Sequence, residues 1–133
     1  MKHIEIRLPG DIGSAEGYAA DTASEQVPNW FHFRHRICVP GLVLQIQATF
    51  ERIAFLNNIN IHDETHRQHG LGKRMLEQFE NEAAEAGAQA IYLLCDLNKD
   101  HAPGFDLAEW YLKQGYEKSA SFSSSRLMML DLR

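Results

Sequence analysis

The chain has 133 residues, of which 44% are hydrophobic and 23% are charged, so it has the size of one ordinary domain and can bury a proper core. Its formal net charge of −5 argues against non-specific binding to DNA or RNA, which draws on clustered Lys and Arg, and fits a cationic or neutral substrate more easily. The N-terminus lacks the apolar run and cleavage site of a leader peptide, and no segment approaches the roughly 20 apolar residues that cross a bilayer. We therefore expect a single cytoplasmic domain over residues 1–133.

The first two segments give different patterns. Residues 3–8 alternate apolar and polar side chains and stop at Pro9-Gly10, which predicts a strand. Residues 13–27 hold apolar side chains at nearly helical spacing but few large ones. This spacing predicts a weakly held helix or a lid.

Three β-type runs follow with short connections. They cover residues 30–39, 42–50 and 53–61, separated by the turn residues Pro40-Gly41 and Glu51-Arg52. Each run alternates and is rich in aromatic or β-branched residues. Because the connections are short, we expect the three runs to form an antiparallel meander.

A long amphipathic helix is predicted after the third run. Its apolar stripe recurs at three- and four-residue intervals and consists of Leu71, Met75, Leu76, Phe79, Ala83 and Ala86. The solvent side is expected to hold Glu77, Gln78, Glu80, Asn81, Glu82 and Glu85. Gly87 suits the left-handed cap that ends a helix.

The remaining segments complete an α/β pattern. Residues 90–94 form a continuous apolar run, typical of a strand covered on both faces, and the strand–helix–strand order favours a parallel pair with a right-handed crossover. A second helix is predicted from Asp106, with Glu109 as its capping-box partner, to Gly115. Residues 119–122 and 126–132 predict two short strands joined by a Ser-rich turn.

The entry into the long helix is suited to an anion. Residues 67–72 read Arg67-Gln68-His69-Gly70-Leu71-Gly72, and the first N–H groups of a helix lack partners within it. Two glycines let a ligand approach the backbone, and Lys73 or Arg74 could pair with a phosphate. The alternative is that Gly70 and Gly72 only allow the helix to pack against its strand.

Two motifs together resemble the GNAT N-acetyltransferase superfamily. Arg67-x-x-Gly70-x-Gly72, between a strand and a helix, resembles that family's acetyl-coenzyme A pyrophosphate loop, and residues 108–116 (AEWYLKQGY) look like its second signature. The resemblance implies a mixed, mostly antiparallel sheet of six to seven strands flanked by helices, that is, an α/β (α+β) fold. It also implies that acetyl-coenzyme A, as co-substrate, is bound by Ile59, Ile61, Arg67, Gln68, His69, Gly70, Leu71, Gly72, Lys73 and Arg74.

The same resemblance points to Tyr111 as the group that protonates the departing thiolate of coenzyme A. The alternative is a core tyrosine whose hydroxyl meets a carbonyl. The general base is not identified, because the strand before the loop offers only Asn57, Asn58 and Asn60. His62, Asp63 and Glu64 at the end of that strand are candidates, and His62 suits the role because an imidazole titrates near neutral pH, although residues 62–66 also read as a solvated turn.

Neither histidines nor cysteines argue for a metal. His62, His66 and His69 fall in a turn where no regular periodicity would bring three imidazoles together. Cys38 and Cys95 show no CxxC spacing and are expected to be buried thiols in a reducing compartment. We predict no metal site and no disulfide.

The function expected from the resemblance is N-acetylation of a primary amine by acetyl-coenzyme A, through direct attack in a ternary complex. The acceptor could be a protein lysine, an N-terminus or a small amine, and a homodimer is an open option. The small size and the run at residues 126–129 look like compact members from phages and mobile elements. The alternative is a non-catalytic acyl-coenzyme A binding or protein-interaction module on the same fold.

Overall fold

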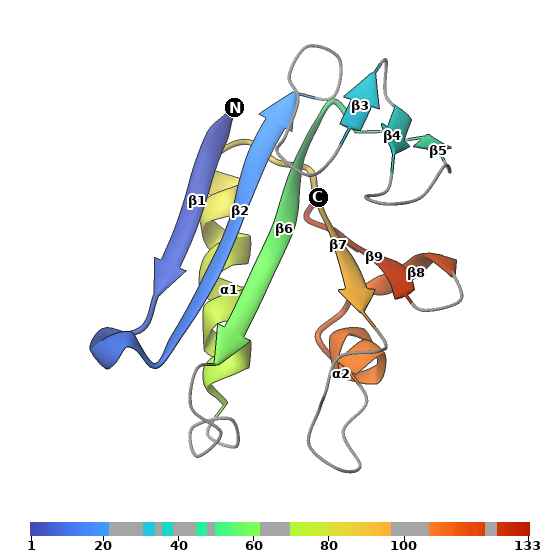
Figure 1. Ribbon diagram of the computed structural model, residues 1–133. Coiled ribbons are helices and arrows are strands. Elements are labelled where there is room, and N and C mark those ends of the chain that lie inside the picture. Colours follow the sequence, from blue (N-terminus) through green and yellow to red (C-terminus); the bar gives the residue numbers. More distant parts are fainter. Residues whose placement is uncertain are drawn as a thin grey trace.

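The computed structural model describes residues 1–21, 31–33, 36–38, 45–47, 50–61, 70–96, 107–121 and 125–133 (Figure 1). Within these ranges the elements are β1 (Lys2–Arg7), a 3-10 turn (Pro9–Asp11), β2 (Gly13–Asp21), β3 (Phe31–Phe33), β4 (Arg36–Cys38), β5 (Gln45–Gln47), β6 (Arg52–Ile61), α1 (Leu71–Glu85), β7 (Ala90–Asp96), α2 (Leu107–Lys113), β8 (Glu117–Ser121) and β9 (Ser125–Asp131). Neither α1 nor α2 is long and apolar enough to cross a membrane.

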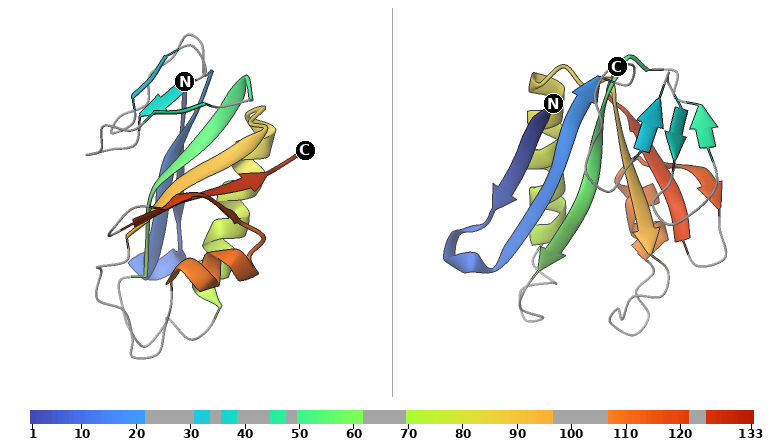
Figure 2. Two further views of the ribbon diagram at one scale, coloured as in Figure 1. Left: turned by 90° about the vertical axis from the view of Figure 1, so that its right-hand side faces the viewer. Right: turned by 45° about the horizontal axis from the view of Figure 1, so that its top comes forward.

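The main sheet has six strands in the order β1-β2-β6-β7-β9-β8. All neighbours in it are antiparallel except β6 and β7, which are parallel and joined through α1. This confirms the predicted parallel pair and the mixed, mostly antiparallel sheet of the predicted fold class. Both α1 and α2 lie on one side of the sheet (Figure 2).

The core has one apolar cluster on each face of the main sheet. On the helix face, the side chains of α1 and α2 pack on inward residues of the strands, among them Ile4, Leu56 and Ile91. On the opposite face, Phe50, Phe55 and Leu127 belong to a second buried cluster. The central strands are therefore covered on both faces, as the continuous apolar run at residues 90–94 predicted.

The prediction of a helix or lid over residues 13–27 is wrong for the part that the structure describes. Residues 13–21 form β2, which pairs with β1 and β6. Its inward positions are small, because Gly13, Ala15, Gly17 and Ala19 are buried in alternation under the helices. Small side chains leave no clear β signal in the sequence, whereas the packing of α1 requires them. Residues 22–27 lie outside the described ranges.

The predicted meander is also corrected. Residues 31–33 and 36–38 are two strands, β3 and β4, instead of one, and β5 pairs with β4 in a separate three-stranded sheet. The third run, β6, pairs with β2 and β7 in the main sheet. Proximity in sequence therefore predicted the wrong neighbour, because pairing with the distant β2 lets β6 lie in the middle of the larger sheet.

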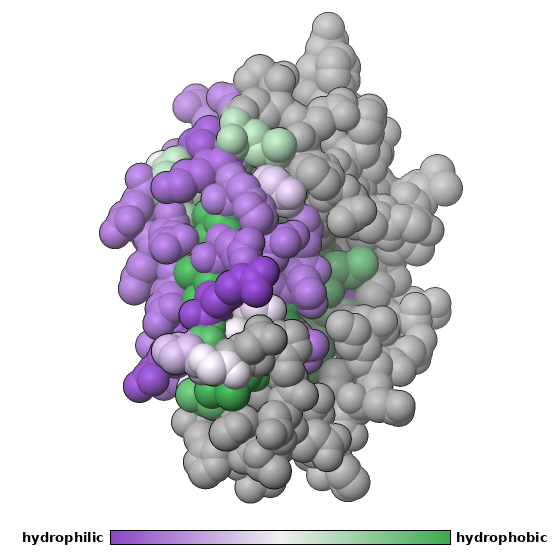
Figure 3. Space-filling view, turned by 60° about the vertical axis from the view of Figure 1, so that its left-hand side comes forward, coloured by the Kyte–Doolittle hydropathy of each residue, from purple (hydrophilic) through white to green (hydrophobic). Residues whose placement is uncertain are grey.

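Element ends follow the sequence closely elsewhere. Gly87 and Gly115 adopt the left-handed conformation, with φ of 87° and 97°, two residues after the last residues of α1 and α2, as predicted for C-terminal caps. The final hairpin is present as β8 and β9. Asp106, the predicted cap of α2, lies outside the described ranges. Figure 3, which brings edge strand β1 forward, shows mainly hydrophilic residues on that side, as expected for an edge that avoids further pairing.

Candidate functional site

The parallel strands β6 and β7 pair along only part of their length. Residues 53–56 pair with residues 90–93, but β6 continues to Ile61 and β7 continues to Asp96. Beyond the paired part, β6 is held on its outer side by β2, and β7 is held on its outer side by β9. Beyond the paired part, the backbone N–H and C=O groups on the facing sides of β6 and β7 therefore form no ladder hydrogen bonds between these two strands.

A β-bulge coincides with the point where β6 and β7 part. Leu56 lies opposite Gly17 and Asn58 lies opposite Glu16, so Asn57 is the extra residue on β6. A bulge bends a strand and increases its twist. Gly17 is the partner at this point because a Cβ there would overlap the carbonyl oxygen of Phe55.

Helix α1 begins near the C-terminal end of β6, at the same end of the sheet (Figure 1). Gly70 precedes it in the left-handed conformation with φ of 71°, and its carbonyl accepts the Arg74 N–H at 3.1 Å. The first turn contains no acidic residue, and Lys73 and Arg74 are exposed there. The first N–H groups of a helix have no partner within it, and together with the helix dipole and these cations they make this turn a favourable place for a phosphate.

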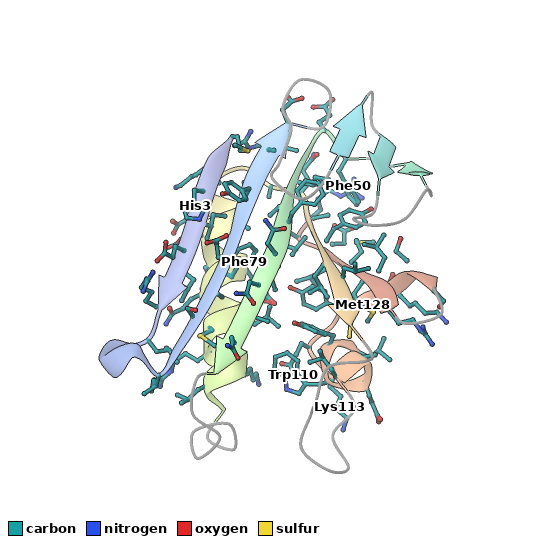
Figure 4. The ribbon with its side chains drawn as sticks, in the orientation of Figure 1. His3, Phe50, Phe79, Trp110, Lys113 and Met128 are labelled. Atoms are coloured by element: carbon teal, nitrogen blue, oxygen red, sulfur yellow. The ribbon has the colours of Figure 1, made fainter. Side chains whose placement is uncertain are left out.

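The two sequence motifs meet in space. A Cβ placed on Gly72 would lie 3.6 Å from the Trp110 ring, so the first turn of α1 packs against α2. Figure 4 shows Trp110 on the side of α2 that faces β6 and α1. Trp110 in turn meets the Tyr111 ring edge to face, with ring centroids 5.0 Å apart. The helix entry and the predicted proton donor therefore belong to one packed unit.

Tyr111 is buried on the helix face of the sheet, with 3% of its surface exposed. Burial raises the pKa of its hydroxyl, and the neighbouring Cys95 raises that pKa further. The hydroxyl therefore stays protonated at neutral pH, which is the state required of a proton donor. Cys95 is buried, as predicted.

The other predicted site residues divide into two groups. Ile59, Ile61, Gly70, Leu71, Gly72, Lys73 and Arg74 lie on the end of β6 or the first turn of α1. His62, Arg67, Gln68 and His69 fall outside the described ranges, so their roles stay predictions. On β6, Asn58 and Asn60 are exposed, and no described residue on that strand supplies a carboxylate or an imidazole.

Sequence reasoning placed Glu80 on the solvent side of α1, but the structure shows it half-buried. Burial raises the pKa of its carboxyl to about 7, and Glu77 one turn away contributes to the rise. Glu80 lies beside the hydroxyl of Tyr116, a core residue of the second motif. The sequence contained a signal for this position, because Glu80 lies four residues after Leu76 and three before Ala83, within the apolar stripe.

One group of described residues has the composition of a metal site. His3, Glu5 and Glu16 place one ligand atom each within 4.8 Å of one another; His3 and Glu5 are exposed on β1, and Glu16 is half-buried on β2. Arg7 already pairs with Glu5, and His3 lies 3.5 Å from Glu16. We assign these residues no metal, since exposed acidic groups of this kind usually bind none. The three histidines considered in the sequence lie outside the described ranges.

Comparison with known proteins gives a family and a fold. Residues 43–116, more than half of the chain, match the model described as "Acetyltransferase (GNAT) family". The search of curated proteins gave no match.

Several solved structures resemble the chain over nearly its whole length. An acetyltransferase from Bacillus cereus has a TM-score of 0.61 at 16% identity, covering 98% of this chain and 74% of that one. A chain of the NatC complex bound to Gag peptide and CoA has a TM-score of 0.57 at 13% identity, covering 95% and 65%. The anti-CRISPR protein AcrVA5 has a TM-score of 0.53 at 16% identity, covering 98% and 100%. At these identities the likeness shows the fold.

Proposed function

Since this chain belongs to the GNAT acetyltransferase family, we propose that it transfers an acetyl group from acetyl-coenzyme A to a primary amine by direct attack in a ternary complex. One observation supports this most directly. Three features lie together at the end of the sheet where β6 and β7 separate. They are the first turn of α1, the unpaired ends of the two strands, and Tyr111. An anion site, a set of backbone hydrogen-bonding groups and a proton donor are what the reaction needs in one place.

The proposed binding site for acetyl-coenzyme A lies at the first turn of α1. The pyrophosphate of acetyl-coenzyme A would be bound by N–H groups of the first turn, around Gly70 and Gly72. Lys73 and Arg74 are exposed beside them and can pair with phosphate oxygens. Arg67, Gln68 and His69 complete the proposed loop. The NatC relative, bound to CoA, supports the choice of this co-substrate.

The chemical arm rests on the parted strands and on Tyr111. The free amine attacks the thioester carbonyl carbon, the C–N bond forms, and negative charge develops on the carbonyl oxygen, where backbone N–H groups of the facing strand edges can stabilise it. The C–S bond then breaks, and Tyr111 gives its proton to the leaving sulfur. The proton lost by the amine passes to solvent, which also restores the Tyr111 hydroxyl.

The acceptor is proposed as a class only. A protein lysine, an N-terminus and a small amine all supply the nucleophile, and the formal net charge of −5 favours a substrate that carries positive charge before it loses its proton. No described residue of β6 acts as an evident base. His62 therefore stays a proposal for that role.

The proposal is tested by release of the free thiol of coenzyme A from acetyl-coenzyme A. The panel holds a lysine peptide, a peptide with a free N-terminus and a polyamine, and we expect turnover with at least one of them. Mass spectrometry of host proteins after expression, scored for added acetyl groups, extends the panel. If acetyl-coenzyme A raises the melting temperature but no amine is acetylated, the chain is a binding module instead. If acetyl-coenzyme A gives no stabilisation far above micromolar concentration, both readings fail.

A further inference from the structure

Tyr116 has a buried hydroxyl without a hydrogen-bond partner among the described residues. The side chain is 2% exposed and belongs to the core on the helix face of the sheet. A buried hydroxyl that donates to nothing is costly, so its surroundings need an explanation. A candidate acceptor is the carboxyl of Glu80 on α1, which acts on the pKa of this hydroxyl, although the structure shows no hydrogen bond between the two groups.

Glu80 is positioned to respond to pH. Its carboxyl is half-buried on α1, and burial, followed by the charge of Glu77, raises its pKa to about 7, while Tyr116 acts in the opposite direction. Helix α1 also packs on β1, β2 and β6, whose residues turned to the helix are apolar in the described ranges. Glu77 and Tyr116 are therefore the titratable groups among the described residues that act on Glu80.

Tyr116 is also coupled to Tyr111. The two rings meet edge to face with centroids 5.6 Å apart, and the backbone N–H of Tyr116 donates to the carbonyl of Tyr111 at 3.1 Å. Helix α1 thus touches the second motif at two points, through Gly72 against Trp110 in its first turn and through Glu80 beside Tyr116 in its third turn. Movement of the Tyr116 ring cannot leave Tyr111 unaffected, because both rings are enclosed in one close-packed core.

We propose that Glu80 and Tyr116 form a positioning pair for Tyr111, in which the ionised Glu80 carboxylate accepts the Tyr116 hydroxyl and thereby fixes the Tyr111 ring. The inference rests on the proposed function for its consequence in catalysis, although the coupling itself is a property of the folded chain. Protonation of Glu80 removes the charge from the acceptor and weakens the bond, since charge-assisted hydrogen bonds are the stronger ones. Tyr111 is then held less firmly when the pH falls below neutrality.

The coupling is tested in the full chain by NMR with tyrosine labelled at the ring carbon that bears the hydroxyl. The chain has four tyrosines, so single Tyr→Phe variants assign the signals. We expect the signals of Tyr116 and Tyr111 to shift together with a midpoint near pH 7, and the shift to disappear in Glu80→Gln. Tyr92, buried in the cluster on the opposite face of the sheet, is the control and should not follow. The coupling is excluded if Tyr111 does not shift, or if it shifts equally in Glu80→Gln.

The catalytic consequence is tested by the ratio of wild-type to Glu80→Gln kcat, with saturating acetyl-coenzyme A and the amine that supports turnover. Ionisation of the amine cancels in this ratio. The ionised fraction of a group with a pKa near 7 rises about tenfold between pH 6 and pH 8, so we expect the ratio to rise by up to about tenfold, with the KM for acetyl-coenzyme A unchanged. The ratio of Tyr116→Phe kcat to Glu80→Gln kcat should therefore stay constant between pH 6 and pH 8.

The two proposals fail in different ways. A constant kcat ratio overturns the positioning role even if Tyr111→Phe abolishes activity, in which case Tyr111 keeps its proposed chemistry. Full activity of Tyr111→Phe instead overturns the assignment of the proton donor, whereas the NMR titration still decides whether Glu80 and Tyr111 are coupled. Circular dichroism of Glu80→Gln and Tyr116→Phe verifies that both variants fold.

Discussion

Gly17 of β2 lies directly under the ring of Phe79 of α1, so close that a Cβ at position 17 would come within 2.7 Å of the ring carbon Cζ. The same Cβ would also overlap the carbonyl oxygen of Phe55 on β6. Since main-chain atoms cannot rotate away as a side chain can, this close approach fixes a glycine where β2, β6 and α1 meet. The bulge at Asn57 begins at the same place, so fold and candidate site share this contact.

Gly17→Ala is therefore expected to destabilise the fold severely. Overpacking of a well-packed core costs about 1–3 kcal/mol and occasionally more, and the overlap with backbone places this change at the upper end, at about 3 kcal/mol. Urea denaturation followed by circular dichroism measures the loss. A change below about 0.5 kcal/mol would mean that β2 and α1 lie further apart than the structure shows.

Gly72→Ala serves as the matched control and is a prediction in itself. Its Cβ would make ordinary contact with Trp110 at 3.6 Å, and replacing glycine by alanine within a helix is worth up to about 1 kcal/mol. We expect stability to be unchanged or slightly raised. If the first turn of α1 binds pyrophosphate, the added methyl group should still raise the KM for acetyl-coenzyme A several-fold, measured by coenzyme A release. An unchanged KM would count against close approach of the cofactor to this backbone.

Much of the part formed by α1, β7 and α2 could be predicted from the sequence, because the sequence signals for these elements are local. The apolar stripe of α1 and the continuous apolar run of β7 report burial directly, and Gly87 and Gly115 mark helix ends through their conformation. The resemblance to the GNAT superfamily predicted that the loop before α1 and the motif at residues 108–116 belong to one site. The packing of Gly72 against Trp110 brings the two motifs into contact.

The rest depends on contacts between distant segments. The inward face of β2 consists of Gly and Ala, whose small size is meaningful only when α1 is already packed on it. The choice of β2 instead of β5 as the neighbour of β6 is likewise non-local. The polarity of Glu80 concealed its place within the apolar stripe, because a charged residue is expected on the solvent side.

Tyr111→Phe is expected to lower kcat by about 100-fold or more, since a positioned proton donor contributes about 10²–10⁴-fold. The hydroxyl alone is removed, so the ring contacts with Trp110 and Tyr116 remain and the KM for acetyl-coenzyme A should change little. Steady-state release of coenzyme A measures both parameters. Tyr92→Phe is the control, because Tyr92 is equally buried but lies in the cluster on the other face of the sheet. Equal losses in both variants would point to a general packing effect and not to proton donation.

Glu80→Gln is expected to stabilise the fold at neutral and alkaline pH. The pKa of Glu80 is raised by burial to about 7 in the folded chain, above the value of about 4.3 expected in the unfolded chain. The folded state therefore binds the proton more tightly, and stability is lost as the pH rises from about 4.5 to 7. Screening by solvent at this half-exposed site reduces the effect to the order of 1 kcal/mol.

The measurement is the free energy of unfolding in urea at pH 5 and at pH 8, with Glu85→Gln, at an exposed position of the same helix, as control. The gain from Glu80→Gln should be present at pH 8 and largely absent at pH 5, whereas Glu85→Gln should change stability little at either pH. Equal gains at both pH values would show that the carboxyl of Glu80 is already ionised at pH 5, and would remove the basis for its response near neutrality. A rise in the free energy of unfolding that Glu80→Gln causes only at pH 8 would show that the ionised carboxylate beside Tyr116 destabilises the fold.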